Sequence, residues 1–299
     1  MLLAIPALRA LRRERPRDEL VIAAQPRIGR LLEALGVVDR SVDFERLGLD
    51  ALFASETSGS EGEWPARCAD ELKRSGRLVA WVGARDPVFV RRLTTLAPGS
   101  IVAASTAGRR PVWEHLADTV GAAADDRQIR APIAIPAALA AEARGELGRL
   151  GWREHDRLLV VHPGAGGPGK QWPATGFAEV VGRLSTLPHL AVAIHQGPAD
   201  AAAVAALPES LIARAISLRE PPLPLLADVL SLAAAYLGND SGVSHLAAAL
   251  GVQSVVLFGE AQLPWRPWAE HVEPLVVSLA ALRESDVERV TAGLARLLA

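Results

Sequence analysis

The segment AYLGNDSGVSHLAAALGVQSVVLFG, residues 235–259, contains a strand, a helix and a second strand in succession. We expect a strand over 235–240, a helix over 241–250 that ends at a left-handed Gly251, and a strand over 253–259. Both strands are largely apolar, which is typical of strands buried on both faces of a sheet. Because a helix joins them, they run parallel. The segment therefore predicts an α/β fold built on a parallel sheet.

The same alternation extends over the rest of the chain. In the second half we expect strands at 158–162, 190–197 and 211–217 and helices at 175–184, 200–207 and 223–235. A capping box formed by Ser285 and Glu288 predicts the start of a last helix. The alternation is less regular in the first half, where we expect strands at 20–24, 40–44, 77–83 and 100–105 and helices at 7–15 and 28–35. Residues 54–66 have the composition of a surface loop.

Composition excludes several classes of protein. The 32 basic and 34 acidic residues show no long basic run, so the positive surface of a nucleic-acid-binding protein is missing. The single cysteine, Cys68, allows no internal disulfide and favours a reducing compartment. The N-terminal segment has its basic residues after its apolar run, unlike a secretory signal, and residues 223–237 are too short to cross a bilayer. We expect a cytoplasmic protein with at most peripheral contact at the inner face of the membrane.

A glycine-rich loop, HPGAGGPGKQWP at 162–173, matches two phosphate-binding patterns and completes neither. A P-loop requires a Ser or Thr and a helix start at its lysine, but Gln171 follows Lys170, and Pro173 delays the helix. A dinucleotide-binding loop requires an acidic residue at the end of the next strand, and none is present. The loop still suits an anion, because its glycines allow close backbone approach and its lysine is positive. A plain turn with a solvated lysine is the alternative.

The loop after the strand at 235–240 is a second candidate anion site. Asp240 or Ser241 caps the following helix, whose first N–H groups have no partner within the helix. Because both loops leave the carboxyl ends of parallel strands, they lie at one edge of the sheet, where two anion sites suit a diphosphate. His245, one turn into the helix, is either a ligand-binding residue or an ordinary packing residue.

Three strings in the second half resemble the signatures of glycosyltransferase family 9, the heptosyltransferase-like enzymes. They are VVHPGAGGPGKQWPATGFAEVV, IHQGPAD and YLGNDSGVSHLAAALGVQSVVLFGE, followed closely by PWRPW. The first half is similar at LLAIPALRALRRERP and at PVWEHLADTVGA, residues 111–122. The resemblance is strong over 158–268 and weak over 45–110.

The resemblance implies a GT-B fold, with two Rossmann-like domains, parallel sheets facing a central cleft, and the nucleotide sugar held mainly by the second domain. It implies an N-terminal acceptor domain over 1–130 that lacks its first strand. A linker over 131–156 and a nucleotide-sugar-binding domain over 157–299 follow, and the last helix is able to pack back on the first domain.

By position, the resemblance assigns donor binding to seven residues. Gly164 in the glycine loop contacts the donor, and Lys170 with the backbone of Ser241 and Gly242 holds the donor phosphates. Asp240 and His245 contact the phosphates or the sugar. Asp200 stands where the family usually has Glu and holds the ribose; an acid favoured by the helix dipole is the alternative. Trp265 and Trp268 are either walls of the base pocket or ordinary core or rim aromatics. No metal and no cofactor is expected.

The resemblance also implies inverting transfer from a nucleoside-diphosphate sugar, such as an ADP-heptose-like donor, to a cell-envelope glycan or glycolipid, as in lipopolysaccharide biosynthesis. The family's catalytic Asp belongs to a G-D pair that falls one place before Met1, so the catalytic residue of this chain is unknown. Three functions stay open: a glycosyltransferase whose natural start lies upstream, a catalytically inactive nucleotide-sugar-binding protein, and a P-loop NTPase.

Overall fold

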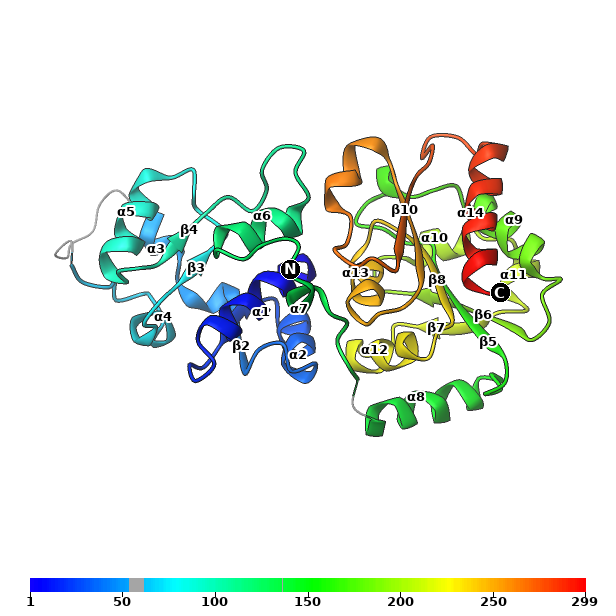
Figure 1. Ribbon diagram of the computed structural model, residues 1–299, viewed down its shortest axis with the longest axis horizontal. Coiled ribbons are helices and arrows are strands. Elements are labelled where there is room, and N and C mark those ends of the chain that lie inside the picture. The colour runs from blue at the N-terminus through cyan, green and yellow to red at the C-terminus, as the bar shows by residue number, and fades with distance from the viewer. Residues whose placement is uncertain (54–61, 136) are drawn as a thin grey trace. The chain divides into compact units, whose positions relative to one another are not determined.

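The computed structural model describes residues 1–53, 62–135 and 137–299, so most of the loop expected at 54–66 lies outside the described residues. The chain divides into two compact units. Met1 and Leu3–Ile129 form the first, and Arg130–Ala299 forms most of the second. Figure 1 shows that both units combine parallel strands with helices, so the predicted α/β class is confirmed.

The second unit is built on one six-stranded parallel sheet, whose strands have the order β10-β9-β8-β5-β6-β7. Its strands are β5 (Arg157–His162), β6 (Leu190–Gln196), β7 (Ile216–Arg219), β8 (Ala235–Asn239), β9 (Ser254–Phe258) and β10 (Val272–Val276). Every residue of β8 and β9 is buried, as expected for central strands covered on both faces. The strand–helix–strand unit predicted over 235–259 is confirmed.

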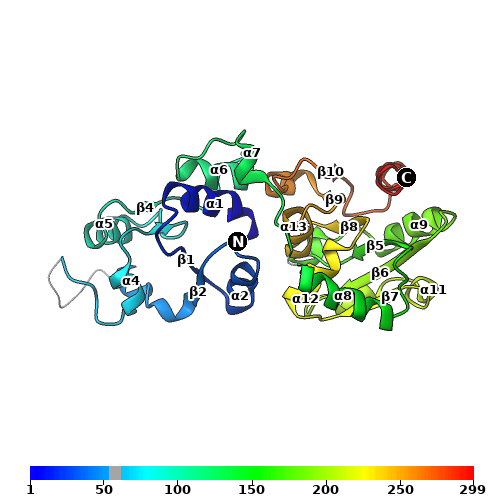
Figure 2. The same cartoon turned by 60° about the horizontal axis from the view of Figure 1, so that its bottom comes forward.

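Helices cover this sheet on its two faces. On one face, α9 (Ala174–Leu184) packs against α14 (Glu284–Leu297), and the predicted apolar stripe of α9 is buried in the core there. On the other, α12 (Leu223–Ser231) packs against α13 (Gly242–Ala249) and α8 (Ala137–Arg149) (Figure 2). Half of the segment expected as a linker over 131–156 is therefore a helix that packs on the second unit. Two short helices, α10 (Ala201–Ala205) and α11 (Glu209–Ile212), follow β6.

The first unit contains two separate parallel pairs of strands, β1-β2 and β3-β4. The strands are β1 (Val21–Ala24), β2 (Arg40–Asp43), β3 (Val79–Ala80) and β4 (Ile101–Val102). The helices are α1 (Ile5–Glu14), α2 (Pro26–Ala34), α3 (Asp50–Phe53), α4 (Asp70–Arg74), α5 (Pro87–Leu96), α6 (Val112–Thr119) and α7 (Arg127–Arg130). The strands expected at 77–83 and 100–105 are thus much shorter than their apolar runs.

The structure corrects two of the predicted elements and contains a strand, β10, that was not predicted. The strand expected at 211–217 is wrong, because Glu209–Ile212 form α11 and the strand begins only at Ile216. The capping box is wrong, because α14 begins at Glu284 and Arg283 precedes it without a side-chain cap. Strand β10, with Pro274 in its centre, was missed; a proline is tolerated there because β10 is an edge strand. No helix among the described residues has the length and apolar character to span a membrane.

Gly251 provides a test of the left-handed end of α13. Its φ is +85°, and a Cβ there would lie 3.0 Å from Cβ of Pro132. We expect Gly251→Ala to lower the free energy of unfolding by about 1–2 kcal/mol in urea denaturation, because a side chain destabilises the left-handed conformation.

Gly182, within α9, is the matched control. Nothing lies within 4 Å of the position that its Cβ would take. Gly182→Ala should therefore raise the free energy of unfolding by roughly 0.5–1 kcal/mol. Equal effects of the two substitutions would contradict a conformational constraint at Gly251.

Candidate functional site

The strand order of the second unit creates a switch point at β5. The chain continues from β5 to β6 and β7 on one side and then crosses to β8 on the other side. Loops from the carboxyl ends of β5 and β8 diverge there, which is the position where open α/β sheets bind ligands. The glycine loop follows β5, and Asp240 follows β8. Both predicted anion loops therefore start at the switch point.

Asn239, the last residue of β8, fastens the glycine loop to the sheet. Its side chain is fully buried, its Nδ2 donates to the carbonyl of Pro163 at 2.8 Å, and its Oδ1 accepts from the N–H of Trp172 at 3.0 Å. One amide group thus holds both ends of the loop. Sequence reasoning missed this role, although Asn239 stands in the GND string of the second loop.

Ser241 caps α13, which decides between the two predicted caps. Its Oγ accepts from the N–H of Ser244 at 3.2 Å. The Ser244 hydroxyl donates to the carbonyl of Asn239 at 2.5 Å and lies 2.9 Å from the hydroxyl of Tyr236. These bonds fix the turn between β8 and α13. The N–H of Gly242, at the first helical position, has no partner within the helix.

Asp240 is the centre of a charged cluster. Its Oδ2 lies 2.8 Å from Nζ of Lys170, and its Oδ1 lies 3.5 Å from Nε2 of His245. Its side chain is 5% exposed. Burial raises the pKa of this carboxyl, but the hydrogen bonds from His245 and Lys170 outweigh burial and leave its pKa below the ordinary value. Asp240 is therefore ionised at neutral pH.

Lys170 is not the solvated lysine of a plain turn. Besides its ion pair with Asp240, its ammonium lies 5.7 Å from the centroid of the Trp265 ring. Trp265 is 40% exposed, whereas Trp268 is buried and is a core aromatic. Lys170 ends a short 3-10 turn, and α9 begins four residues later. Because no helix starts at the lysine, the P-loop interpretation is wrong.

Asp200 lies against the glycine loop. It is buried, and its Oδ2 accepts from the N–H of Gly197 at 2.8 Å. A Cβ at position 164 would overlap the carboxylate of Asp200, so only glycine fits there. The close neighbour that explains Gly164 is therefore an aspartate of the same unit.

Two buried histidines lie behind Asp200. The Nδ1 atoms of His162 and His195 are 3.0 Å apart, and Nε2 of His162 lies 3.9 Å from Oδ2 of Asp200. Burial lowers the pKa of both imidazoles, that of His195 to about 3. Both rings are therefore neutral, and one Nδ1–H donates to the other ring. Sequence reasoning missed this pair, whose signal was a histidine near the end of each of two consecutive strands.

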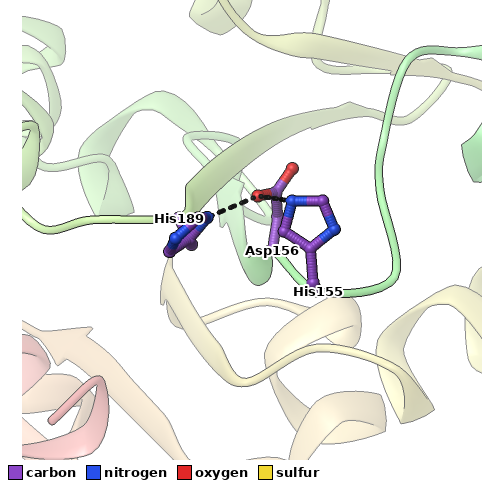
Figure 3. Close-up of side chains that lie close together, drawn as sticks. All are labelled: His155, Asp156 and His189. Atoms are coloured by element: carbon purple, nitrogen blue, oxygen red, sulfur yellow. Dashed lines mark ion pairs between the residues drawn. The ribbon is translucent and has the colours of Figure 1, made fainter.

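Two groups of described residues have side chains suited to metal ions. One is the buried group His162, His195 and Asp200, in which Asp200 already accepts from a backbone N–H. The other is exposed: Figure 3 shows the rings of His155 and His189 beside the carboxylate of Asp156, at 3.5 and 3.6 Å. The exposed group precedes β5 and β6, at the opposite end of the sheet from the glycine loop. We assign no metal ion to the buried group.

The structure brings the seven predicted donor-binding residues to the ends of three neighbouring strands. They follow β5 (Gly164, Lys170), β6 (Asp200) and β8 (Asp240, Ser241, Gly242, His245). Asp240 contacts both Lys170 and His245, whereas Asp200 lies with Gly164 and the histidine pair. The arrangement offers a helix N-terminus and an ammonium beside a glycine loop, which is suited to an anion.

Comparisons with known proteins identify the family and the fold of the chain. The sequence profile of glycosyltransferase family 9 (heptosyltransferase) matches residues 113–292, more than half of the chain. A comparison with curated proteins gives no significant match.

Several solved structures have a similar fold. The ADP-heptose LPS heptosyltransferase II of E. coli is 19% identical with a TM-score of 0.71, over 100% of this chain and 95% of that one. A family 9 glycosyltransferase of Veillonella parvula is 17% identical with a TM-score of 0.72, over 99% and 93%. The E. coli heptosyltransferase WaaC with ADP-2-deoxy-2-fluoro heptose is 17% identical with a TM-score of 0.65, over 99% and 95%. At this identity the similarity concerns the fold, which is GT-B.

The buried histidine pair predicts acid sensitivity. Between pH 6.5 and about 3, the unfolded chain binds a proton at His195 that the folded chain excludes, so stability falls as pH falls through this range. We expect this histidine to add a slope of up to about 1.4 kcal/mol per pH unit to the free energy of unfolding. His195→Gln should reduce the slope, measured by urea unfolding at pH steps from 8 to 4.

Measurements above pH 7 serve as the control, since both forms of His195 are neutral there. The variant can lose stability at that pH through lost contacts, but the difference between the variant and the natural chain should shrink with acidification. A constant difference over the whole range would rule out a buried neutral imidazole at position 195.

Proposed function

Because the chain belongs to glycosyltransferase family 9, we propose that it transfers a heptose-like sugar from a nucleoside-diphosphate donor to an acceptor of the cell envelope. The acceptor we propose is a glycan or lipid-linked glycan, and the transfer inverts the anomeric carbon. We further propose a cytoplasmic location, with at most peripheral contact at the inner face of the membrane.

The observation that carries the proposal is the contact between Lys170 and Asp240 at the start of α13. A diphosphate bound at this switch point would face the N–H of Gly242 and the adjacent helix dipole. Its negative charge would compete with Asp240 for the Lys170 ammonium, which remains partly exposed and able to turn. The ion pair therefore keeps the lysine next to the phosphate site until the donor arrives.

The remaining predicted residues receive roles from their positions. We propose that Gly164, which leaves room for the Asp200 carboxylate, contacts the donor through its backbone and that Ser241 orients the helix terminus. Asp200 binds the ribose hydroxyls through the oxygen that does not accept from Gly197. His245, whose Nε2 faces Asp240, holds that carboxylate when Lys170 turns toward the phosphates.

The proposed chemistry is electrostatic. As the bond to the sugar breaks, negative charge grows on the departing diphosphate, and fixed N–H groups with a lysine stabilise that charge where it develops. The attacking hydroxyl needs a base positioned within hydrogen-bond reach. We assign this base to none of the described residues. A catalytically inactive nucleotide-sugar-binding protein is thus the second candidate, and separate binding and transfer assays distinguish the two.

We expect one class of donor to stabilise the protein. In a thermal-shift panel of ADP-, GDP-, UDP- and dTDP-sugars, an ADP-heptose-like donor should raise the melting temperature most. Saturation at about 100 times Kd corresponds to about 2.7 kcal/mol. Stabilisation should persist in EDTA, since no metal enters the proposed site. Binding without release of nucleoside diphosphate in the presence of envelope glycans would favour the inactive alternative, and no shift with any donor would contradict both.

Lys170 should contribute directly to donor binding. We expect Lys170→Ala to weaken donor binding by about 1.5–3 kcal/mol, the range for a hydrogen bond to a charged group, measured by calorimetry. The chain has only one other lysine, Lys73, an exposed residue that pairs with Asp70 in α4. Lys73→Ala is the matched control and should leave the affinity unchanged.

A double variant separates two effects of losing Lys170. Lys170→Ala also leaves the carboxylate of Asp240 without its ammonium, which by itself repels an anion. Asp240→Asn combined with Lys170→Ala removes this repulsion, so the double variant should still bind less tightly than Asp240→Asn alone. Equal affinities of these two variants would show that the ammonium does not contact the donor.

A further inference from the structure

Two turns meet at the amino ends of β5 and β6, at the opposite end of the sheet from the glycine loop. His155 and Asp156 come directly before β5, and His189 comes directly before β6. Arg157 pairs with Leu190 in the register of the two strands, so Asp156 and His189 stand side by side. Figure 3 shows the carboxylate of Asp156 between the two imidazole rings. Three side chains of metal-binding type thus converge from two neighbouring turns.

The distances between these three side chains suit metal ligands better than hydrogen bonds. Oδ1 of Asp156 lies 3.5 Å from Nε2 of His155 and 3.6 Å from Nδ1 of His189. Both distances exceed the roughly 2.7–3.2 Å of an N–H···O hydrogen bond. Two ligands that each lie about 2.0–2.1 Å from a tetrahedral zinc ion are about 3.4 Å apart. One ligand atom from each residue lies within 4.8 Å of the other two, so small rotations of the rings would complete the geometry.

The backbone of both turns is held in place before any ion binds. The N–H of Asp156 donates to the carbonyl of Arg153 at 2.8 Å, and the carbonyl of Asp156 accepts from Nε1 of Trp152 at 3.1 Å. The N–H of Arg157 donates to the carbonyl of His189 at 2.6 Å and so joins the two turns. An ion would therefore have to order only three side chains, which keeps the entropic cost of binding low.

His189 has an unusual backbone conformation. Its φ is +55°, and the only other non-glycine residue with a positive φ, among those that the structure describes, is Glu220. Gly and Asn adopt this left-handed conformation most readily, so the turn by itself does not require a histidine. The side chain of His189 is 65% exposed, so packing does not require it either. The position therefore offers an imidazole to solvent beside Asp156.

Two imidazoles and one carboxylate form a set of ligands that is typical of zinc. Imidazole nitrogen suits Zn²⁺ and other first-row transition metals, whereas Mg²⁺ and Ca²⁺ prefer oxygen ligands. The side chain of His155 is 60% exposed and that of Asp156 is 19% exposed, so an ion can reach them from solvent. Water can then take the remaining coordination position, as it does in zinc sites with three protein ligands.

We propose that His155, Asp156 and His189 form a binding site for a divalent transition-metal ion, and that Zn²⁺ is the ion favoured by these ligands. The ion binds Nε2 of His155, Oδ1 of Asp156 and Nδ1 of His189, and it links the turn before β5 to the turn before β6. Because the unfolded chain does not hold these residues together, the ion stabilises the folded second unit. The site lies within that unit and does not depend on the proposed donor site, for which no metal is proposed.

The first test titrates the unsubstituted chain and its variants with Zn²⁺ alone and measures binding by calorimetry. We expect one ion per chain, and His189→Asn should weaken binding at least about tenfold, because asparagine keeps the left-handed turn but has no imidazole. Asp156→Asn keeps the size of the side chain, removes its charge and should also weaken binding. His115→Gln is the matched control, since it removes a histidine of the first unit, and it should leave the affinity for zinc unchanged.

The second test locates the effect by amide hydrogen exchange. Zn²⁺ should slow exchange about tenfold in peptides covering 153–157 and 187–190 of the unsubstituted chain, and it should have no such effect on His189→Asn. Exchange in peptides covering β8 and β9 should be equal in the two chains without zinc, which shows that the variant is folded.

Two outcomes would overturn the proposal. A zinc Kd weaker than about 0.1 mM in the unsubstituted chain would show that the three groups form exposed ion pairs only. Equal affinities of the unsubstituted chain and His189→Asn would show that zinc binds elsewhere, for example at the buried group of His162, His195 and Asp200.

Discussion

The amide of Asn239 is the interaction on which the candidate site depends. Strands β5 and β8 are parallel neighbours at the point where the order of strand addition switches from one side of the sheet to the other. The loops that follow them leave in opposite directions and need a contact that holds them together. By donating to Pro163 and accepting from Trp172, the buried amide ties the start and the end of the glycine loop to β8. The loop can therefore be rich in glycine, and hence intrinsically flexible, while keeping its position relative to α13. An aspartate or leucine could not replace this group, because the site requires both a donor and an acceptor.

The charges around this loop are balanced before any ligand binds. A buried carboxylate without a partner costs several kcal/mol, and Asp240 avoids that cost through Lys170 and His245. This balance would limit anion binding, because the Lys170 ammonium can pair with an anion only to the extent that its ion pair with Asp240 breaks. His245 contacts the other carboxylate oxygen, so Asp240 retains a partner when Lys170 turns away. If the proposed site binds an anion, this competition would favour ligands of high negative charge, such as a diphosphate, over weakly charged ones.

Local patterns predicted the second unit well because its elements follow from short-range constraints. Phe177 and Leu184 repeat at helical spacing and are buried, and Gly251 has the left-handed conformation that its position after a helix indicates. The strand at 211–217 was predicted wrongly because the alternation in LIARAIS also fits a helical turn, and tertiary packing decided between them. The partners of Lys170 and His162 lie 70 and 33 residues away in sequence, so no local pattern could identify them. The choice between Asp240 and Ser241 as the cap was likewise open, because both residue types cap helices.

The two units differ in how many strand neighbours their strands have and in how deeply those strands are buried. In the second unit, β5, β8 and β9 each have two strand neighbours, and nearly all of their residues are buried. In the described part of the first unit, β1 and β3 each have one strand neighbour, and the strands are short and partly exposed. Stability within a protein varies with such local packing, so the two-stranded sheets should open more readily than the centre of the six-stranded sheet. The residues proposed to bind the donor all follow strands of the six-stranded sheet in the second unit, and their positions depend on contacts within that unit. The proposed donor binding and the proposed sugar transfer can therefore be tested separately, since only transfer requires a second substrate and a base besides the donor site.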